Sequence, residues 1–164
     1  MKILVKKNKL SFCNTLYDCA VGKNGTTLDK TEGDGKTPAG NFSFTKVFYR
    51  EDKMPPLKFG LESEPIKPNS GWCDDPESKS YNQFIKLPFN ASAEKLFRSD
   101  DLYDLLFVID YNINPIIKNK GSAIFLHIAK DDFSGTEGCI ALRKNDLIKI
   151  AEKIDSQTKI LIVN

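Results

Sequence analysis

A continuous apolar run at residues 123–128 reads AIFLHI and contains the only histidine of the chain, His127. A second apolar run, LLFVID, lies at residues 105–110. Runs of this kind, without alternation of polar and apolar residues, are typical of central strands that are covered on both faces. We therefore expect two buried strands here, with His127 held near the end of one of them.

Other segments also have the pattern of strands. Short runs rich in apolar, β-branched and aromatic residues, bounded by turn residues, predict strands at residues 2–5, 10–16, 41–49, 83–87 and 159–163. Helices are few. Leu147, Ile150, Ala151 and Ile154 recur at helical spacing and predict a helix over residues 144–154.

One further helical turn is expected at residues 92–97, with Ser92 as its N-cap. The predicted strands do not alternate regularly with helices, which disfavours a doubly wound parallel sheet. The sequence therefore predicts a mainly β fold, that is, a β-rich α+β fold.

Two long segments are interpreted as loops. Residues 21–40 are rich in Gly, Asp, Asn and Thr, the composition of an ordered turn region. Residues 50–77 are rich in proline, and irregular segments of that length in a compact domain are usually functional or disordered. Trp72 lies in this second segment and indicates that it is anchored to the rest of the fold.

Length and charge narrow the possible classes of protein. The chain has 164 residues, which suits one domain over residues 1–164. Its net charge is only +2, which argues against a dedicated nucleic-acid binder. No apolar run is long enough to span a membrane, and residues 1–7 lack the apolar core of a signal peptide. We expect either a cytoplasmic protein or an export signal that lies outside this sequence.

The four cysteines do not form a metal-binding pattern. They lie at Cys13, Cys19, Cys73 and Cys139, no two are spaced Cys-x-x-Cys, and a single histidine cannot complete a two-His motif. A structural zinc site is therefore not expected. A disulfide between Cys13 and Cys19 is conceivable, although spacing alone cannot establish one.

Cys139 follows His127 by twelve residues, after a polar, glycine-containing loop. A Cys-His pair suits nucleophilic catalysis, because the imidazole can take the thiol proton or, as imidazolium, lower the thiol pKa. Backbone N–H groups around Gly138 and Cys139 are candidates for binding an oxyanion. A hydrogen-bonded structural histidine and an inert buried cysteine are the alternative interpretation, and the two residues alone leave both open.

Several motifs in order resemble the L,D-transpeptidase catalytic domain, the YkuD-like family. The loop before Ile140 reads SGTEGCI over residues 134–140, and a segment reading GDGKTPAGNF covers residues 33–42. The motifs GWCDDP at residues 71–76, YN at 81–82 and GSAIFLH at 121–127 resemble one bacterial branch of this family. Two positions depart from it: Glu137 stands where many members have His, and Ala141 stands where many have Asn or Arg.

The resemblance implies a sandwich-like or barrel-like catalytic domain with few short helices and no metal or cofactor. It implies Cys139 as the nucleophile, His127 as its proton carrier and Gly138 beside them. We expect a substrate-binding role for six further residues: Arg143, Thr136, Ser134, Trp72, Tyr81 and Asn82. Arg143 is the nearest cation that could replace the missing one at Ala141, or it belongs to the start of the following helix. Trp72 has a second interpretation as a packing anchor.

The function implied by the resemblance is that of a peptidoglycan L,D-transpeptidase. In this hypothesis Cys139 cleaves an L–D peptide bond of a stem peptide and passes the acyl group to an amine, or to water as an L,D-carboxypeptidase. The alternatives are a cell-wall amidase or hydrolase of the same fold and a non-catalytic peptidoglycan-binding module. Peptidoglycan stem peptides are then the expected partners, and the cell envelope or periplasm the expected location.

Overall fold

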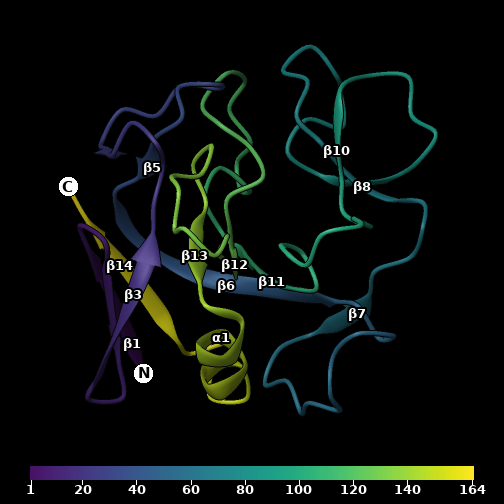
Figure 1. Cartoon of the computed structure of the whole chain (residues 1–164). Coiled ribbons are helices and arrows are strands. Elements are labelled where there is room, and N and C mark those ends of the chain that lie inside the picture. Colours follow the sequence, from purple (N-terminus) through teal and green to yellow (C-terminus); the bar gives the residue numbers. More distant parts are fainter.

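A computed structural model describes all residues from 1 to 164 (Figure 1). It contains fourteen strands and one α-helix. In chain order, the elements are β1 (Lys2–Lys6), β2 (Lys9–Phe12), β3 (Thr15–Ala20), β4 (Thr26–Thr27), β5 (Thr37–Pro38), β6 (Gly40–Tyr49), β7 (Ser63–Pro65), β8 (Ser70–Cys73), β9 (Phe84–Lys86), β10 (Ala93–Lys95), β11 (Leu105–Ile109), β12 (Phe125–Ile128), β13 (Ile140–Leu142), α1 (Lys144–Ala151) and β14 (Lys159–Val163). The predicted mainly β fold is confirmed.

The largest sheet closes on itself. Its strand order is β11-β12-β13-β3-β2-β1-β14-β6-β7, and β11 also pairs with β6. Most neighbours are antiparallel, but the pairs β1–β14, β12–β13 and β6–β7 are parallel. Because β6 runs for ten residues, it reaches β14 with its first half and β11 with its second. The result is a barrel of short strands around one interior.

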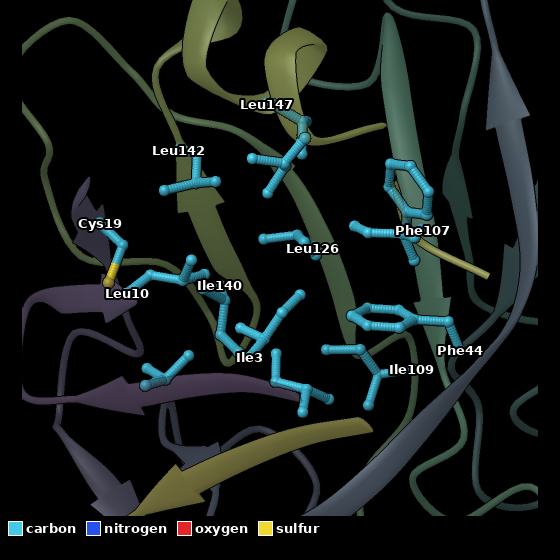
Figure 2. Close-up of a cluster of buried hydrophobic side chains, with 14 of the residues drawn as sticks. Ile3, Leu10, Cys19, Phe44, Phe107, Ile109, Leu126, Ile140, Leu142 and Leu147 are labelled. Atoms are coloured by element: carbon cyan, nitrogen blue, oxygen red, sulfur yellow. The ribbon is translucent and has the colours of Figure 1, made fainter. Parts of the chain in front are cut away.

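The barrel interior holds the main hydrophobic core. Figure 2 shows side chains from several strands and from α1 pointing into this shared space. In β11, Leu105, Phe107 and Ile109 belong to this core, whereas Leu106 and Val108 belong to a second cluster outside the barrel. The sequence prediction that this strand is covered on both faces is confirmed, since all five of its residues are buried.

A second, smaller sheet covers the outer face of β11 and β12. It has the order β10-β8-β9 and lies on the right of Figure 1. Trp72 of β8 packs edge-to-face on Phe125 of β12, with ring centroids 5.2 Å apart. This contact confirms that Trp72 anchors the proline-rich segment, and it places a second layer beside the strand that carries His127.

Some local predictions were wrong. Residues 10–16 form two strands instead of one, because Cys13 and Asn14 adopt φ of 49° and 59° and make a tight hairpin turn. Residues 93–95 form β10 instead of a helical turn capped by Ser92, because pairing with β8 outweighs the local signal. Strand β13 lies in a segment that was not predicted as a strand.

All four cysteines are free. Cys13 lies in the hairpin turn, while Cys19 lies near the far end of β3, where its neighbour Asp18 is paired with Lys9. The conceivable disulfide between Cys13 and Cys19 is therefore not formed. The one α-helix, α1, has eight residues and is not long and apolar enough to cross a membrane.

Candidate active site

The register of two neighbouring strands brings His127 and Cys139 to one face of the sheet. Strand β12 pairs in parallel with β13, so that Leu126 is opposite Ile140 and His127 is opposite Ala141. Side chains alternate between the two faces of a strand. Leu126 and Ile140 point into the barrel core, and His127 and Cys139 therefore share the outer face.

A cavity of about 440 Å³ opens over this face. Its lining includes Cys139 and His127 together with Gly138, Thr136, Ser134 and Glu137. Cavities of this size are typical of sites for small ligands or short peptide segments. The structure thus gathers the predicted nucleophile, the predicted base and the loop between them around one space.

The histidine ring has a defined tautomer. The Nδ1 atom of His127 lies 2.8 Å from the carbonyl oxygen of Ile128. A carbonyl oxygen can only accept a hydrogen bond, so Nδ1 carries the proton and Nε2 is free to act as a base. Burial lowers the pKa of His127 to about 4, because the charged form is poorly solvated there. Tyr103 holds the ring edge-on at a centroid distance of 5.2 Å.

The thiol of Cys139 is a neutral hydrogen-bond donor in this state. Its Sγ atom donates to the carbonyl oxygen of Ala123 at 3.1 Å and lies 3.4 Å from the N–H group of Phe125. Burial raises the pKa of the Cys139 thiol, and the nearby carboxylate of Glu94 raises it further. A neutral thiol and a neutral imidazole are the protonation states that a general-base role for His127 would require, whereas a thiolate–imidazolium pair would require the opposite shifts of both pKa values.

Gly138 and Thr136 shape the loop that precedes Cys139. Gly138 has a φ of 145°, and a Cβ atom there would come within 2.9 Å of the carbonyl oxygen of Lys36. The N–H group of Gly138 donates to Oγ1 of Thr136 at 3.1 Å, and that hydroxyl donates to the carbonyl oxygen of Cys139 at 2.6 Å. The Gly138 N–H group, predicted as an oxyanion donor, is therefore engaged within the loop.

Residues 3–162 match the family model of the L,D-transpeptidase catalytic domain, named YkuD. The chain belongs to the YkuD family. No functionally described protein matches it.

A solved structure titled "Structure of Bdellovibrio bacteriovorus Bd1075" resembles this YkuD domain, with a TM-score of 0.50 and 22% sequence identity. The similarity covers 98% of this chain but only 46% of the Bdellovibrio chain. The chain thus spans less than half the length of that protein. At this level of identity the likeness concerns the fold alone.

Four of the predicted substrate-binding residues of this YkuD domain do not line the cavity. Trp72 and Asn82 are 6% and 3% exposed and bind each other through the indole N–H group and the amide oxygen, 3.0 Å apart. The hydroxyl of Tyr81 donates to Glu32 and accepts from the N–H group of Gly121 at 3.0 Å. Arg143 is exposed, and its guanidinium group lies 4.7 Å from the ring centroid of Phe133.

The cavity also contains charged residues that the sequence did not single out. Lys30 lines it with a side chain that is only 3% exposed and pairs with Asp34. Glu94 of β10 lines it as well and accepts a hydrogen bond of 2.6 Å from the hydroxyl of Tyr103. Burial raises the pKa of Glu94, and the nearby carboxylate of Asp74 raises it further. No spacing signal identifies these residues, because they reach the YkuD cavity from separate loops and from the second sheet.

The two family positions with unusual residues have different surroundings. Glu137 is exposed, and its Oε1 atom accepts a hydrogen bond from Nζ of Lys23 at 2.7 Å. Ala141 is buried beside His127 in the strand pair. No group of three or more His, Cys, Asp and Glu side chains is arranged to hold a metal ion.

Proposed function

We propose that this YkuD domain is a cysteine acyltransferase that cleaves an L–D peptide bond in peptidoglycan stem peptides. The observation that carries the proposal is the placement of Cys139 and His127 on one face of the β12–β13 pair, in the wall of one cavity. An acyltransferase needs a nucleophile and a base that share access to one substrate carbonyl. The substrate class, peptidoglycan stem peptides, is inferred from membership of the family.

The geometry supports a general-base route to the thioester. Nε2 of His127 takes the Sγ proton as sulfur attacks the carbonyl carbon of the L–D bond. The C–N bond then breaks, and the imidazolium returns the proton to the departing amine. In the second half an amine, or water, gives its proton to Nε2 while it attacks the thioester. The C–S bond breaks, and the thiolate of Cys139 recovers the proton.

The charges of the cavity suit a peptide that carries both amino and carboxyl groups. The lining combines cationic Lys30 and Arg98 with acidic Asp74 and Glu94. One carboxylate oxygen of Asp74 is buried without a hydrogen-bond partner in the protein. A buried unpaired oxygen of this kind favours a ligand that brings a donor, such as an ammonium group. With this substrate, the proposed site of action is the cell envelope, where peptidoglycan lies.

Purified muropeptides provide the test of this function. We expect the protein to form a covalent adduct at Cys139 and to release a terminal D-amino acid, both followed by mass spectrometry. Cross-linked dimers indicate transfer to an amine, and shortened stems without dimers indicate carboxypeptidase action. Release of an intact stem would instead establish an amidase and refute the proposal.

Two variants accompany this test. Cys139→Ala should abolish both the adduct and the products, because the attacking atom is gone. Cys13→Ala is the matched control, because Cys13 is exposed in a hairpin turn far from the cavity lining. Binding of muropeptides without turnover by either the native protein or the control would support a non-catalytic module.

A further inference from the structure

Ala123 has an unusual backbone conformation immediately before β12. Its φ is 53°, in the left-handed region that residues with a Cβ atom rarely adopt. The cost of this conformation for an alanine is roughly tenfold or more in population. Its carbonyl oxygen accepts the hydrogen bond from Sγ of Cys139 at 3.1 Å. The left-handed backbone of Ala123 therefore positions the carbonyl oxygen that binds the thiol of Cys139.

Asn82 holds this conformation from the other side of the same residue. The N–H group of Ala123 donates to Oδ1 of Asn82 at 3.0 Å, and the indole N–H group of Trp72 donates to the same oxygen at 3.0 Å. The amide nitrogen of Asn82 donates to the carbonyl oxygens of Asn112 at 2.7 Å and Tyr111 at 3.3 Å. Both ends of the amide are thus occupied, which fixes its orientation.

The position of Asn82 excludes direct contact with a substrate in the cavity. Its side chain is 3% exposed and is absent from the cavity lining. The side chain of Asn82 connects two parts of the fold. One contact, Trp72, belongs to β8, and the others belong to the segment that precedes β12. Asn82 can therefore affect the reaction only through the backbone that it holds.

We propose that Asn82 is a positioning residue for the nucleophile, acting through the peptide groups of Ala123. This inference rests on the proposed role of Cys139. Asn82 fixes the Ala123 N–H group, the left-handed backbone then directs the Ala123 carbonyl oxygen toward Sγ, and the sulfur stays beside β12. The sulfur is thereby kept on the face that carries His127, and its proton is kept on sulfur until a substrate enters.

Loss of the Asn82 amide should have two opposite effects. The Ala123 backbone is then free to leave its left-handed conformation, and the thiol loses its carbonyl acceptor. A hydrogen bond donated by the neutral thiol disfavours the thiolate, so its loss should make Cys139 more reactive toward a small alkylating reagent. Catalysis should nevertheless slow, because a displaced reacting atom can cost up to about a hundredfold in rate.

Asn82→Gly is the variant of choice. Asn82 has a φ of 55°, which glycine adopts without strain, so the variant removes the amide and keeps the backbone. Asn112→Gly is the matched control. Asn112 has a φ of 52° and also bonds loop backbone, with contacts to Ile117 and Gly121 between 2.7 and 2.9 Å, but its side chain does not bond Ala123.

The measurements are the pH profile of Cys139 alkylation by iodoacetamide, with Cys13 as an internal reference, and kcat and KM on muropeptides. For Asn82→Gly we expect faster Cys139 alkylation at pH 7, a kcat reduced about tenfold or more and an unchanged KM. Asn112→Gly should change neither rate. Equal effects of the two variants, or a change in KM alone, would overturn the inference.

Asn82→Asp is a second variant for the case that Asn82→Gly does not fold, as judged by circular dichroism. Its carboxylate oxygen can still accept from Ala123 and Trp72, while the two donors to the loop are lost. Cys139 should then remain protected from alkylation, and rapid alkylation in the folded variant would contradict the proposed route through Ala123. Because alkylation needs no substrate, its outcome stands even if muropeptides are not turned over.

Discussion

The Nδ1–H group of His127 donates a hydrogen bond to the carbonyl oxygen of Ile128, the next residue along β12. The ring is therefore oriented by the backbone of its own strand, without a carboxylate partner. Two consequences follow. Nε2 is the basic nitrogen, and the charges of Arg98 and Asp100, which shift the pKa of His127 in opposite directions, have less effect on it than burial. Burial then dominates, and the pKa of His127 falls to about 4.

The acid limb of the pH–rate profile should reflect this low pKa. We expect kcat/KM on muropeptides to stay high as the pH falls through 6.5, the ordinary value for histidine, and to drop only near pH 4. The proposed mechanism requires the base form of His127, and this form persists down to the folded-state pKa. An acid limb centred at pH 6 or above would contradict the buried neutral imidazole.

Stability should depend on pH in the same window. The folded-state pKa of His127 is lower than the unfolded value of 6.5, so the unfolded chain binds the additional proton between pH 6.5 and about 4. The free energy of unfolding should therefore fall as the pH drops through this range. Since His127 is the only histidine, the difference between the native protein and His127→Gln isolates its contribution. Parallel stability curves for the two proteins would exclude this effect.

The thiols should differ in reactivity in an order set by burial. Cys13 is exposed, whereas Cys139 is buried and its proton is bonded to Ala123. Burial raises the pKa of the Cys139 thiol, so little thiolate is present at neutral pH. We expect iodoacetamide to modify Cys13 first at pH 7, with each site followed by peptide mass mapping. Preferential labelling of Cys139 in the free protein would show that its thiolate is already formed.

Glu94 should restrain the nucleophile electrostatically. Its carboxylate lies near Cys139 and contributes to raising the thiol pKa. Glu94→Gln keeps an oxygen that can accept from Tyr103 and removes the charge, so alkylation of Cys139 at neutral pH should accelerate. Glu62→Gln is a suitable control, because the Glu62 side chain is 74% exposed and does not line the cavity. Unchanged alkylation in Glu94→Gln would show that the charge of Glu94 does not affect the reactivity of the Cys139 thiol.

The same variant should also change the pH dependence of stability. Burial raises the pKa of Glu94 above its ordinary value of 4.5, so the folded protein retains this proton more strongly than the unfolded chain. The native protein should lose this contribution as the pH rises above about 4.5. The melting temperature of Glu94→Gln, relative to the native protein, should therefore increase between pH 4 and pH 7.

The sequence identified those parts of the site that depend on strong local patterns. The runs at residues 105–110 and 123–128 predicted central strands because strands covered on both faces are apolar throughout, and both strands are present. The placement of His127 near the end of an apolar strand followed from the same pattern. Strand β13 was not predicted, because three residues are too few for a recognisable period.

Local sequence patterns did not predict the contacts between segments that are distant along the chain. Residues 92–97 resemble a capped helical turn, but Glu94 pairs with Trp72 across β8 and β10 and thereby reaches the cavity. Asn82 was expected to bind substrate, yet the four hydrogen bonds of its side chain connect it to Trp72, Tyr111, Asn112 and Ala123. Only the three-dimensional arrangement distinguishes a residue that lines a cavity from one that binds and positions the lining residues.

A substitution at Gly138 tests whether the close packing of the loop before Cys139 against Lys36 is needed for function. Gly138→Ala introduces a Cβ atom 2.9 Å from the carbonyl oxygen of Lys36, at a φ of 145°. Gly25→Ala is the matched control, because Gly25 also has a positive φ of 84° but no atom within 4 Å of an added Cβ.

Both alanine variants carry the backbone cost of a left-handed residue, roughly 1–2 kcal/mol, which thermal unfolding measures. Only Gly138→Ala adds a collision with rigid backbone, so it should be the less stable of the two and should lose most of its muropeptide turnover. The turnover of Gly25→Ala should remain near the native rate after correction for the folded fraction. If Gly138→Ala retained native turnover, the close approach of this loop to Lys36 would not be needed to place Cys139.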